Sequence, residues 1–255
     1  GSYIAAMADE VGAHRGIRGH IASDIPAGAG LSSSAALECA IGLALGFDGT
    51  PLELSHAAQR AEHRATGVPT GIMDQLSIAS GVEGHAPLID CHDLSVTPHL
   101  MPDDIDIVVE FIVRRTLEGS EYSDRVAECR RAEDDIGPLR LASLDAVERI
   151  GDETARRRAR HVVRENRRVL EFATALARGD YREAGRIMGD GHASLRDDFE
   201  VSTPQMDAAV ATTAAQPGVF GSRMTGGGFG GCIVSICEPG ALTTGWNVSP
   251  SAGAR

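Results

Sequence analysis

The sequence predicts an α+β protein, and three observations lead to this prediction. Residues 105–113 are rich in β-branched and apolar residues, as expected of a buried strand. The pattern is helical from residue 120 to about 215. A second apolar strand, residues 232–237, follows that helical stretch. Strands mixed with helices, then helices alone, then a strand are typical of an α+β architecture.

The N-terminal part supplies the first of those elements. Residues 16–23 alternate loosely between apolar and polar side chains and predict a strand that leads into a glycine turn. Residues 35–47 are good helix formers and predict a buried helix. Thr50 as N-cap, with Pro51 at the first helical position, predicts a second helix over residues 51–66.

The middle of the chain continues the alternation of helices and strands. A helical segment begins near Gly71 and stops at Gly81, and residues 86–90 and 95–100 predict the strands of a hairpin. A domain boundary is expected near residues 100–120. The helical stretch beyond it has four breaks: Gly137-Pro138, Gly151, Gly179 and Thr203-Pro204.

Composition excludes several functional classes. A formal net charge of −12, with arginine as the only strongly basic residue type, argues against nucleic acid as a partner. The 5 cysteines are odd in number and show no Cys-x-x-Cys spacing, so neither a disulfide framework nor a zinc site is indicated. This usage predicts a cytoplasmic protein. No apolar run reaches membrane-spanning length, and no membrane partner is expected.

The segment 26–38 carries the strongest functional signal. Gly28 and Gly30 allow a tight turn, three serines follow at 32–34, and a helix begins. A glycine turn that opens a helix presents N–H groups and the positive end of the helix dipole to a phosphate. The absence of lysine excludes a Walker A loop.

Two other interpretations of this turn stay open at the level of residues. A dinucleotide site would use Gly28, Gly30 and the acid Asp48, but Ser33 occupies the third glycine position and the required second strand is missing. The second interpretation is an ordinary strand-to-helix turn with a serine cap. The three consecutive serines favour phosphate binding.

Glu62 and Asp74 form a second candidate group. One lies near the end of a predicted helix and the other begins the next, so a short Gly/Pro turn could bring them to one pocket. A carboxylate with a serine hydroxyl can hold Mg²⁺, and a second carboxylate can accept a proton from an attacking hydroxyl. On spacing alone, the better interpretation is that Glu62 is a solvated helix acid and Asp74 an N-terminal helix acid favoured by the dipole.

Residues 226–231 formally match Gly-x-Gly-x-x-Gly, but a strand follows them where a dinucleotide site needs a helix. A flexible turn and a loop that lays its backbone beside a ligand are both consistent with this segment.

Together these segments resemble the GHMP family of small-molecule kinases and, within it, the branch that phosphorylates galactose. The resemblance runs from about residue 3 to 237 and rests on six motifs in the family's order: Pro26–Glu38, Gly71–Gln75, Gly84–Cys91, Ser120–Arg125, Ser194–Ser202 and Arg223–Cys232.

The resemblance implies the GHMP kinase fold. A ribosomal-protein-S5-like N-terminal domain, here truncated, would be the ATP-binding part and occupy residues 1–105. A ferredoxin-like C-terminal GHMP kinase domain would occupy residues 106–255. It also implies a monomer whose small-molecule partner is galactose.

The implied reaction is ATP-dependent phosphorylation of galactose at C1, with Mg²⁺. Asp74 would be the catalytic base, Ser34 and Glu62 would hold the metal, and Gly71, Asp74 and Tyr122 would contact the sugar. The ATP phosphates would lie on the loop residues Gly28, Ala29, Gly30, Leu31, Ser32, Ser33 and Ser34.

The chain departs from the family's pattern in three places, one of which is the C-terminal end, where a helix expected after Cys237 is missing. The sequence motif that normally stands near the N-terminus of proteins in this branch is absent. We therefore expect the chain as given to have little or no kinase activity. Glu110, Phe111 and Arg115 stand where the family usually has Asp-Thr and then a histidine. Two alternatives therefore stay open: a non-catalytic protein that binds galactose or ATP, and a GHMP kinase for homoserine or mevalonate.

Overall fold

A computed structural model describes residues 2–14, 16–26, 28–115 and 120–254. The chain divides into two compact units. The first comprises residues 1–27, 31–101 and 249–255, and the second comprises residues 28–30 and 102–248. The phosphate-binding loop predicted at 28–34 therefore contributes residues to both units.

The first unit is a cluster of helices with a β-hairpin. Four helices pack on one another around an apolar core that includes Met7, Cys39 and Ala58. The strands β1 and β2 pair antiparallel from His85↔Leu100 to Asp90↔Ser95, which confirms the predicted hairpin. The elements are α1 (Ser2–Glu10), α2 (Ser33–Ala44), α3 (Pro51–Thr66), α4 (Met73–Ala79), β1 (His85–Asp90) and β2 (Ser95–Leu100).

Helix α3 has the bounds that its sequence predicts. Thr50 and Glu53 form a reciprocal capping box: the Thr50 N–H donates to Glu53 Oε2 at 2.7 Å, and the Glu53 N–H donates to Thr50 Oγ1 at 3.3 Å. Gly67 ends the helix with a φ of +73°. These caps fix where the helix ends, and so place Glu62 near its last turn.

The strand predicted at 16–23 is wrong. These residues form no strand, and their side chains are exposed, with Ile17 at 51% and Ile21 at 53%. A strand needs a neighbour that accepts and donates its backbone hydrogen bonds. No strand in the described part of the chain pairs with this segment, so the alternating pattern has no sheet to join.

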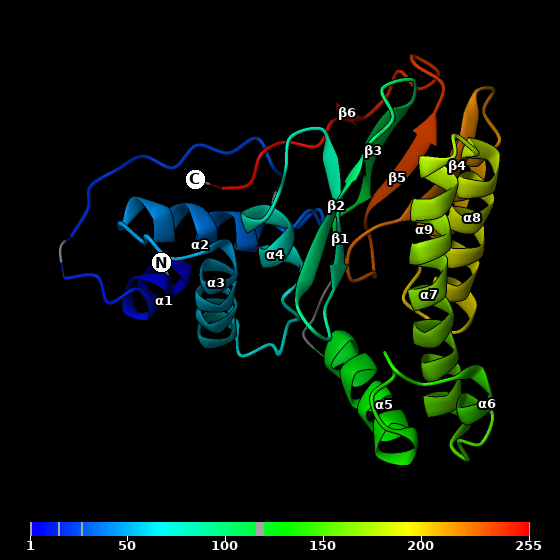
Figure 1. Cartoon of the computed structure of the whole chain (residues 1–255), viewed down its shortest axis with the longest axis horizontal. Helices are drawn as coiled ribbons and strands as arrows, with labels where there is room; N and C mark the ends of the chain where they lie inside the picture. The colour runs from blue at the N-terminus through cyan, green and yellow to red at the C-terminus, as the bar shows by residue number, and fades with distance from the viewer. Residues whose placement is uncertain (1, 15, 27, 116–119, 255) are drawn as a thin grey trace. The chain divides into compact units, whose positions relative to one another are not determined.

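The second unit is a four-stranded antiparallel sheet with helices packed against it (Figure 1). The strand order is β4-β5-β3-β6, and α8 and α9 pack on β4. Strand β4 has no counterpart in the sequence prediction. The elements are β3 (Asp106–Val113), α5 (Ser120–Ile136), α6 (Leu144–Val147), α7 (Glu153–Ala177), α8 (Tyr181–Asp197), α9 (Pro204–Ala214), β4 (Val219–Met224), β5 (Gly231–Cys237) and β6 (Trp246–Val248).

The end of the chain returns to the first unit. The Gly253 N–H donates to Gly81 O at 2.7 Å, and the Ala254 N–H donates to Ile78 O at 2.9 Å. These bonds tie the chain end to the C-terminal end of α4, which carries Asp74 in its first turn. None of the helices in the described ranges combines the length and apolar character that a membrane crossing requires.

Candidate active site

The predicted phosphate-binding loop has an unusual backbone conformation. Gly28 and Gly30 have φ values of +76° and +73°, and Ser32 has a φ of +56°. Ser32 is the N-cap of α2, yet its side chain makes no capping hydrogen bond. A non-glycine residue in the left-handed region is strained, and such strain is concentrated at functional sites. The helix thus begins at Ser33 without the usual side-chain cap.

The first three residues of this loop lie against the second glycine-rich segment. A Cβ placed on Gly226 would be 2.7 Å from Gly30 O, and one placed on Gly231 would be 2.8 Å from Ala29 O. Only glycine lets backbones approach this closely. The backbone of the 226–231 segment therefore packs against residues 28–30, and the segment is not an isolated turn.

Glu62 is the centre of a hydrogen-bonded cluster in the first unit. Ser34 Oγ donates to Glu62 Oε1 at 2.7 Å, Gln75 Nε2 donates to Oε2 at 2.7 Å, and Thr70 Oγ1 donates to Oε2 at 3.1 Å. Glu62 is buried, with 9% of its surface exposed. The interpretation of Glu62 as a solvated helix acid is therefore wrong.

The Ser34–Glu62 pair fits a magnesium ion by the chemistry of its donors. Magnesium prefers hard oxygen ligands, takes few from the protein and keeps several waters. A carboxylate oxygen and a hydroxyl oxygen 2.7 Å apart meet that preference. Within the described residues, no group of three or more His, Cys, Asp or Glu side chains gathers as a metal site.

Asp74 is tied to this cluster through its neighbour in the sequence. It lies half-buried in the first turn of α4, and the next residue, Gln75, makes the bond to Glu62. Gly71, which precedes the helix, is exposed, with no atom within 4 Å of where a Cβ would lie. The first unit therefore places the predicted base, one predicted sugar contact and the predicted metal ligands on α2, α3, α4 and the loop before α4.

Tyr122, the remaining predicted sugar contact, belongs to the second unit. It is half-buried on α5, and its ring lies 3.6 Å from where a Cβ on Gly227 would be. Tyr122 therefore lies beside the 226–231 segment.

Glu38 and Gln75 take part in the site without having been singled out from the sequence. Glu38 is fully buried on α2, and neither carboxylate oxygen has a hydrogen-bond partner in the described residues. Burial raises the pKa of the Glu38 carboxyl to about 8, and the charge of Glu62 adds to the shift. An acid one helical turn after Ser34, on an otherwise apolar helix, was the available signal.

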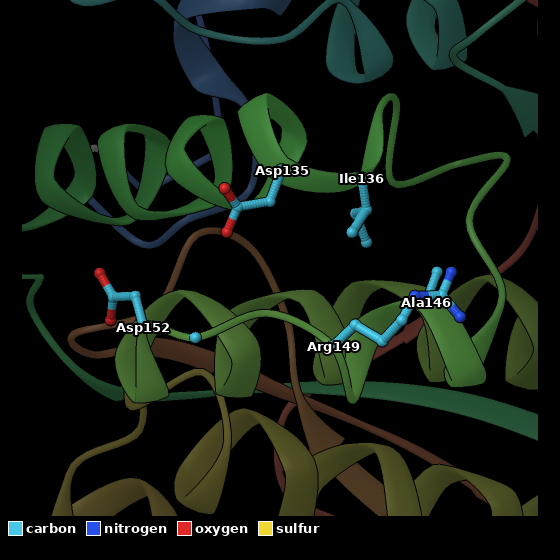
Figure 2. Close-up of a pocket in the computed structure, with 6 residues that line it drawn as sticks. Asp135, Ile136, Ala146, Arg149 and Asp152 are labelled. Carbon is cyan, nitrogen blue, oxygen red and sulfur yellow. The ribbon is translucent and has the colours of Figure 1, made fainter.

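A hollow of about 700 Å³ lies elsewhere, at the ends of α5, α6 and α7 (Figure 2). Asp135 at the end of α5 and Asp152 at the start of α7 lie on opposite sides of it. Asp152 already caps α7 and accepts from Arg131 Nε at 3.1 Å. None of the predicted site residues lines this hollow, so it has no part in the site.

Comparison with known proteins identifies the class. Residues 2–82 match the family described as GHMP kinases N terminal domain, and residues 172–243 match GHMP kinases C terminal. The chain belongs to the GHMP kinase family, which confirms the fold class and the resemblance. The mevalonate kinase of L. major shares the fold, with a TM-score of 0.62 at 15% identity over 99% of this chain and 77% of that one.

Within the family, the chain is similar to galactokinases. It is 44% identical to the galactokinase of Homo sapiens over 87% of this chain and 59% of the human protein. It is 45% identical to that of Roseiflexus sp. over 88% of this chain and 61% of the relative. The crystal structure of Lactococcus lactis galactokinase complexed with galactose matches with a TM-score of 0.85 and 35% identity, over 92% of this chain and 66% of that one. The chain thus spans about three fifths of the length of these curated relatives.

Proposed function

We propose that the protein transfers the γ-phosphoryl group of ATP to the C1 hydroxyl of galactose. The observation that carries the proposal is the cluster around Glu62. It joins Ser34 of the glycine-serine motif, Glu62 of α3 and Gln75 of the Gly71–Gln75 motif within hydrogen-bond distance. Similarity to galactokinases supports galactose as the acceptor.

ATP would place its phosphates on residues 28–34. The left-handed backbone of Gly28, Gly30 and Ser32, and the start of α2 at Ser33, favour an anion at this loop. Phosphoryl transfer depends mainly on positioning and on the stabilisation of charge. Backbone N–H groups provide both here without a lysine.

Ser34 and Glu62 would hold Mg²⁺, which supplies charge neutralisation to the phosphates when it is bound. Gln75 and Thr70 donate to Glu62 Oε2, so that oxygen is fixed while Oε1 faces Ser34. This division keeps the carboxylate in one orientation toward the hydroxyl.

Asp74 would accept the proton of the C1 hydroxyl as the C1 oxygen bonds to the γ-phosphorus. The bond from that phosphorus to the β–γ bridging oxygen breaks, and ADP leaves with its electron pair. Gly71 and Tyr122 would contact the sugar. Since Gln75 ties α4 to Glu62, the base and the metal ligand share one rigid support.

The test is release of ADP by the purified protein, measured with and without galactose. Galactose-dependent ADP release, with sugar phosphorylated at C1 detected by ³¹P NMR, is the expected result for an active form. ADP release that depends on homoserine or mevalonate, and not on galactose, would replace the proposed substrate.

Calorimetry separates the kinase from a binding protein. A chain that binds ATP and galactose tightly, while no form of the protein makes product, would be a sensor and not a kinase. The monomeric state and the cytoplasmic location are part of the same proposal; the 5 free cysteines support the second. Light scattering tests the first.

A further inference from the structure

Arg115 lies where the two glycine-rich segments meet in the second unit. Its backbone N–H donates to Gly28 O at 3.2 Å, and its side-chain Nε donates to Gly228 O at 2.9 Å. One residue is therefore bonded to the first loop through its backbone and to the second through its guanidinium group.

The side chain also runs along bare backbone on both loops. A Cβ on Gly30 would be 3.6 Å from Arg115 Cδ, one on Gly231 would be 3.8 Å from Cγ, and one on Gly227 would be 2.6 Å from Nη2. The first two distances are ordinary van der Waals contacts, whereas at Gly227 a side chain would collide with the guanidinium group, so glycine there leaves room for it. The stem of the side chain is therefore packed on the same two segments that its hydrogen bonds join.

We propose that Arg115 is a positioning residue that fixes residues 28–30 against the 226–231 segment and so preorganises the nucleotide loop. The inference rests on the proposed function of that loop. Backbone N–H groups stabilise phosphate charge only when they are held in place before the ligand arrives. A hydrogen bond from a guanidinium to a carbonyl is charge-assisted and stronger than a neutral one, and so suits this task.

Hydrogen exchange without nucleotide tests the anchoring directly. Arg115→Lys keeps the charge but has no donor at the Nε position, and Arg115→Met removes both the charge and the donor. We expect both variants to exchange the amide hydrogens of residues 28–30 and 226–230 roughly five- to tenfold faster than the wild type, the effect of losing one hydrogen bond. Arg156→Lys, which loses a guanidinium bond to Ile150 O at 3.3 Å in the second unit, is the control and should leave these amides unchanged.

Ligand affinity distinguishes positioning from charge. If Arg115 acts by anchoring, Arg115→Lys and Arg115→Met should weaken binding of Mg·ATP to a similar extent and leave galactose affinity unchanged. Full ATP affinity in Arg115→Lys alongside loss in Arg115→Met would overturn the inference, as would unchanged amide exchange in both. A wild-type chain that binds no Mg·ATP would contradict the proposed function, whereas the exchange comparison would still decide the anchoring.

Discussion

At the residue scale, the Glu62 carboxylate is the centre of the candidate site. Three donors from three segments hold it, and it is buried. The family resemblance nominated Glu62 and Ser34, but neither it nor the spacing along the chain could reveal that Gln75 and Thr70 complete the cluster. Those contacts depend on how α3 and α4 pack, which is a tertiary property.

Asp74 carries the first prediction. In a form of the protein that turns over galactose, Asp74→Asn should lower kcat by about 10²–10⁴-fold, because an amide cannot accept the proton. ATP affinity should be kept, since the proposal places the phosphates on residues 28–34. Coupled ADP release and calorimetry measure the two effects, with Asp93→Asn in the β1–β2 turn as the charge-matched control. Unchanged turnover would remove Asp74 from the role of base.

Glu38 predicts a dependence of stability on pH. Its folded-state pKa is raised from 4.5 to about 8, so the folded chain keeps a proton that the unfolded chain loses. The free energy of unfolding should therefore fall as pH rises from 4.5 toward 8, because the unfolded state binds fewer protons there.

Urea unfolding of the metal-free chain across that pH range measures the effect. Glu38→Gln has no titrating proton at this position and should give a flatter curve, with its largest gain over the wild type at the alkaline end. Parallel curves for the two proteins would show that the Glu38 carboxyl titrates alike in the folded and unfolded states.

At the element scale, the sequence correctly predicted those helices and strands whose formation depends on residues close together in the chain. The capping box and Gly67 define α3, and the apolar runs define β1, β3 and β5. The strand prediction for residues 16–23 was wrong because a strand needs a neighbouring strand to pair with, and the local sequence pattern does not reveal whether one exists. Strand β4 was not predicted because its Phe-Gly-Ser-Arg stretch does not alternate clearly between apolar and polar residues.

The contact between the glycine loops predicts the effect of one methyl group. Gly226→Ala would place a Cβ 2.7 Å from Gly30 O at a φ of +77°. Both the strain and the displaced loop should lower ATP affinity about tenfold or more, and destabilise the fold by about 1–3 kcal/mol.

Gly240→Ala is the matched control, with the same φ of +77° and no atom within 4 Å of the new Cβ. It should show the cost of strain alone and leave ATP affinity intact. An equal loss of ATP affinity in both variants would mean that the close approach of the loops does not matter for nucleotide binding.

At the scale of the whole molecule, the motifs were informative because their order along the chain is specific to one family. The family match confirms that inference. The division of the chain was harder to foresee, because residues 28–30 and 249–255 each belong to a unit other than that of their sequence neighbours. The unit to which these two segments belong depends on tertiary packing, and the local sequence does not indicate it.

The expectation of little or no kinase activity for the 255-residue chain belongs to this scale and stays a prediction. Weak galactose binding alongside measurable Mg·ATP binding is the expected calorimetric result. Robust galactose-dependent ADP release by this chain alone would contradict it.

The central claim is that one site built on residues 28–34, Glu62 and Asp74 binds ATP and activates the sugar. A crystal structure with galactose, Mg²⁺ and a non-hydrolysable ATP analogue tests it most directly. We expect phosphate oxygens on the amides of residues 28–34, the metal on Ser34 and Glu62, and Asp74 within hydrogen-bond distance of the C1 hydroxyl. Nucleotide bound elsewhere, or Asp74 remote from the sugar, would contradict the account.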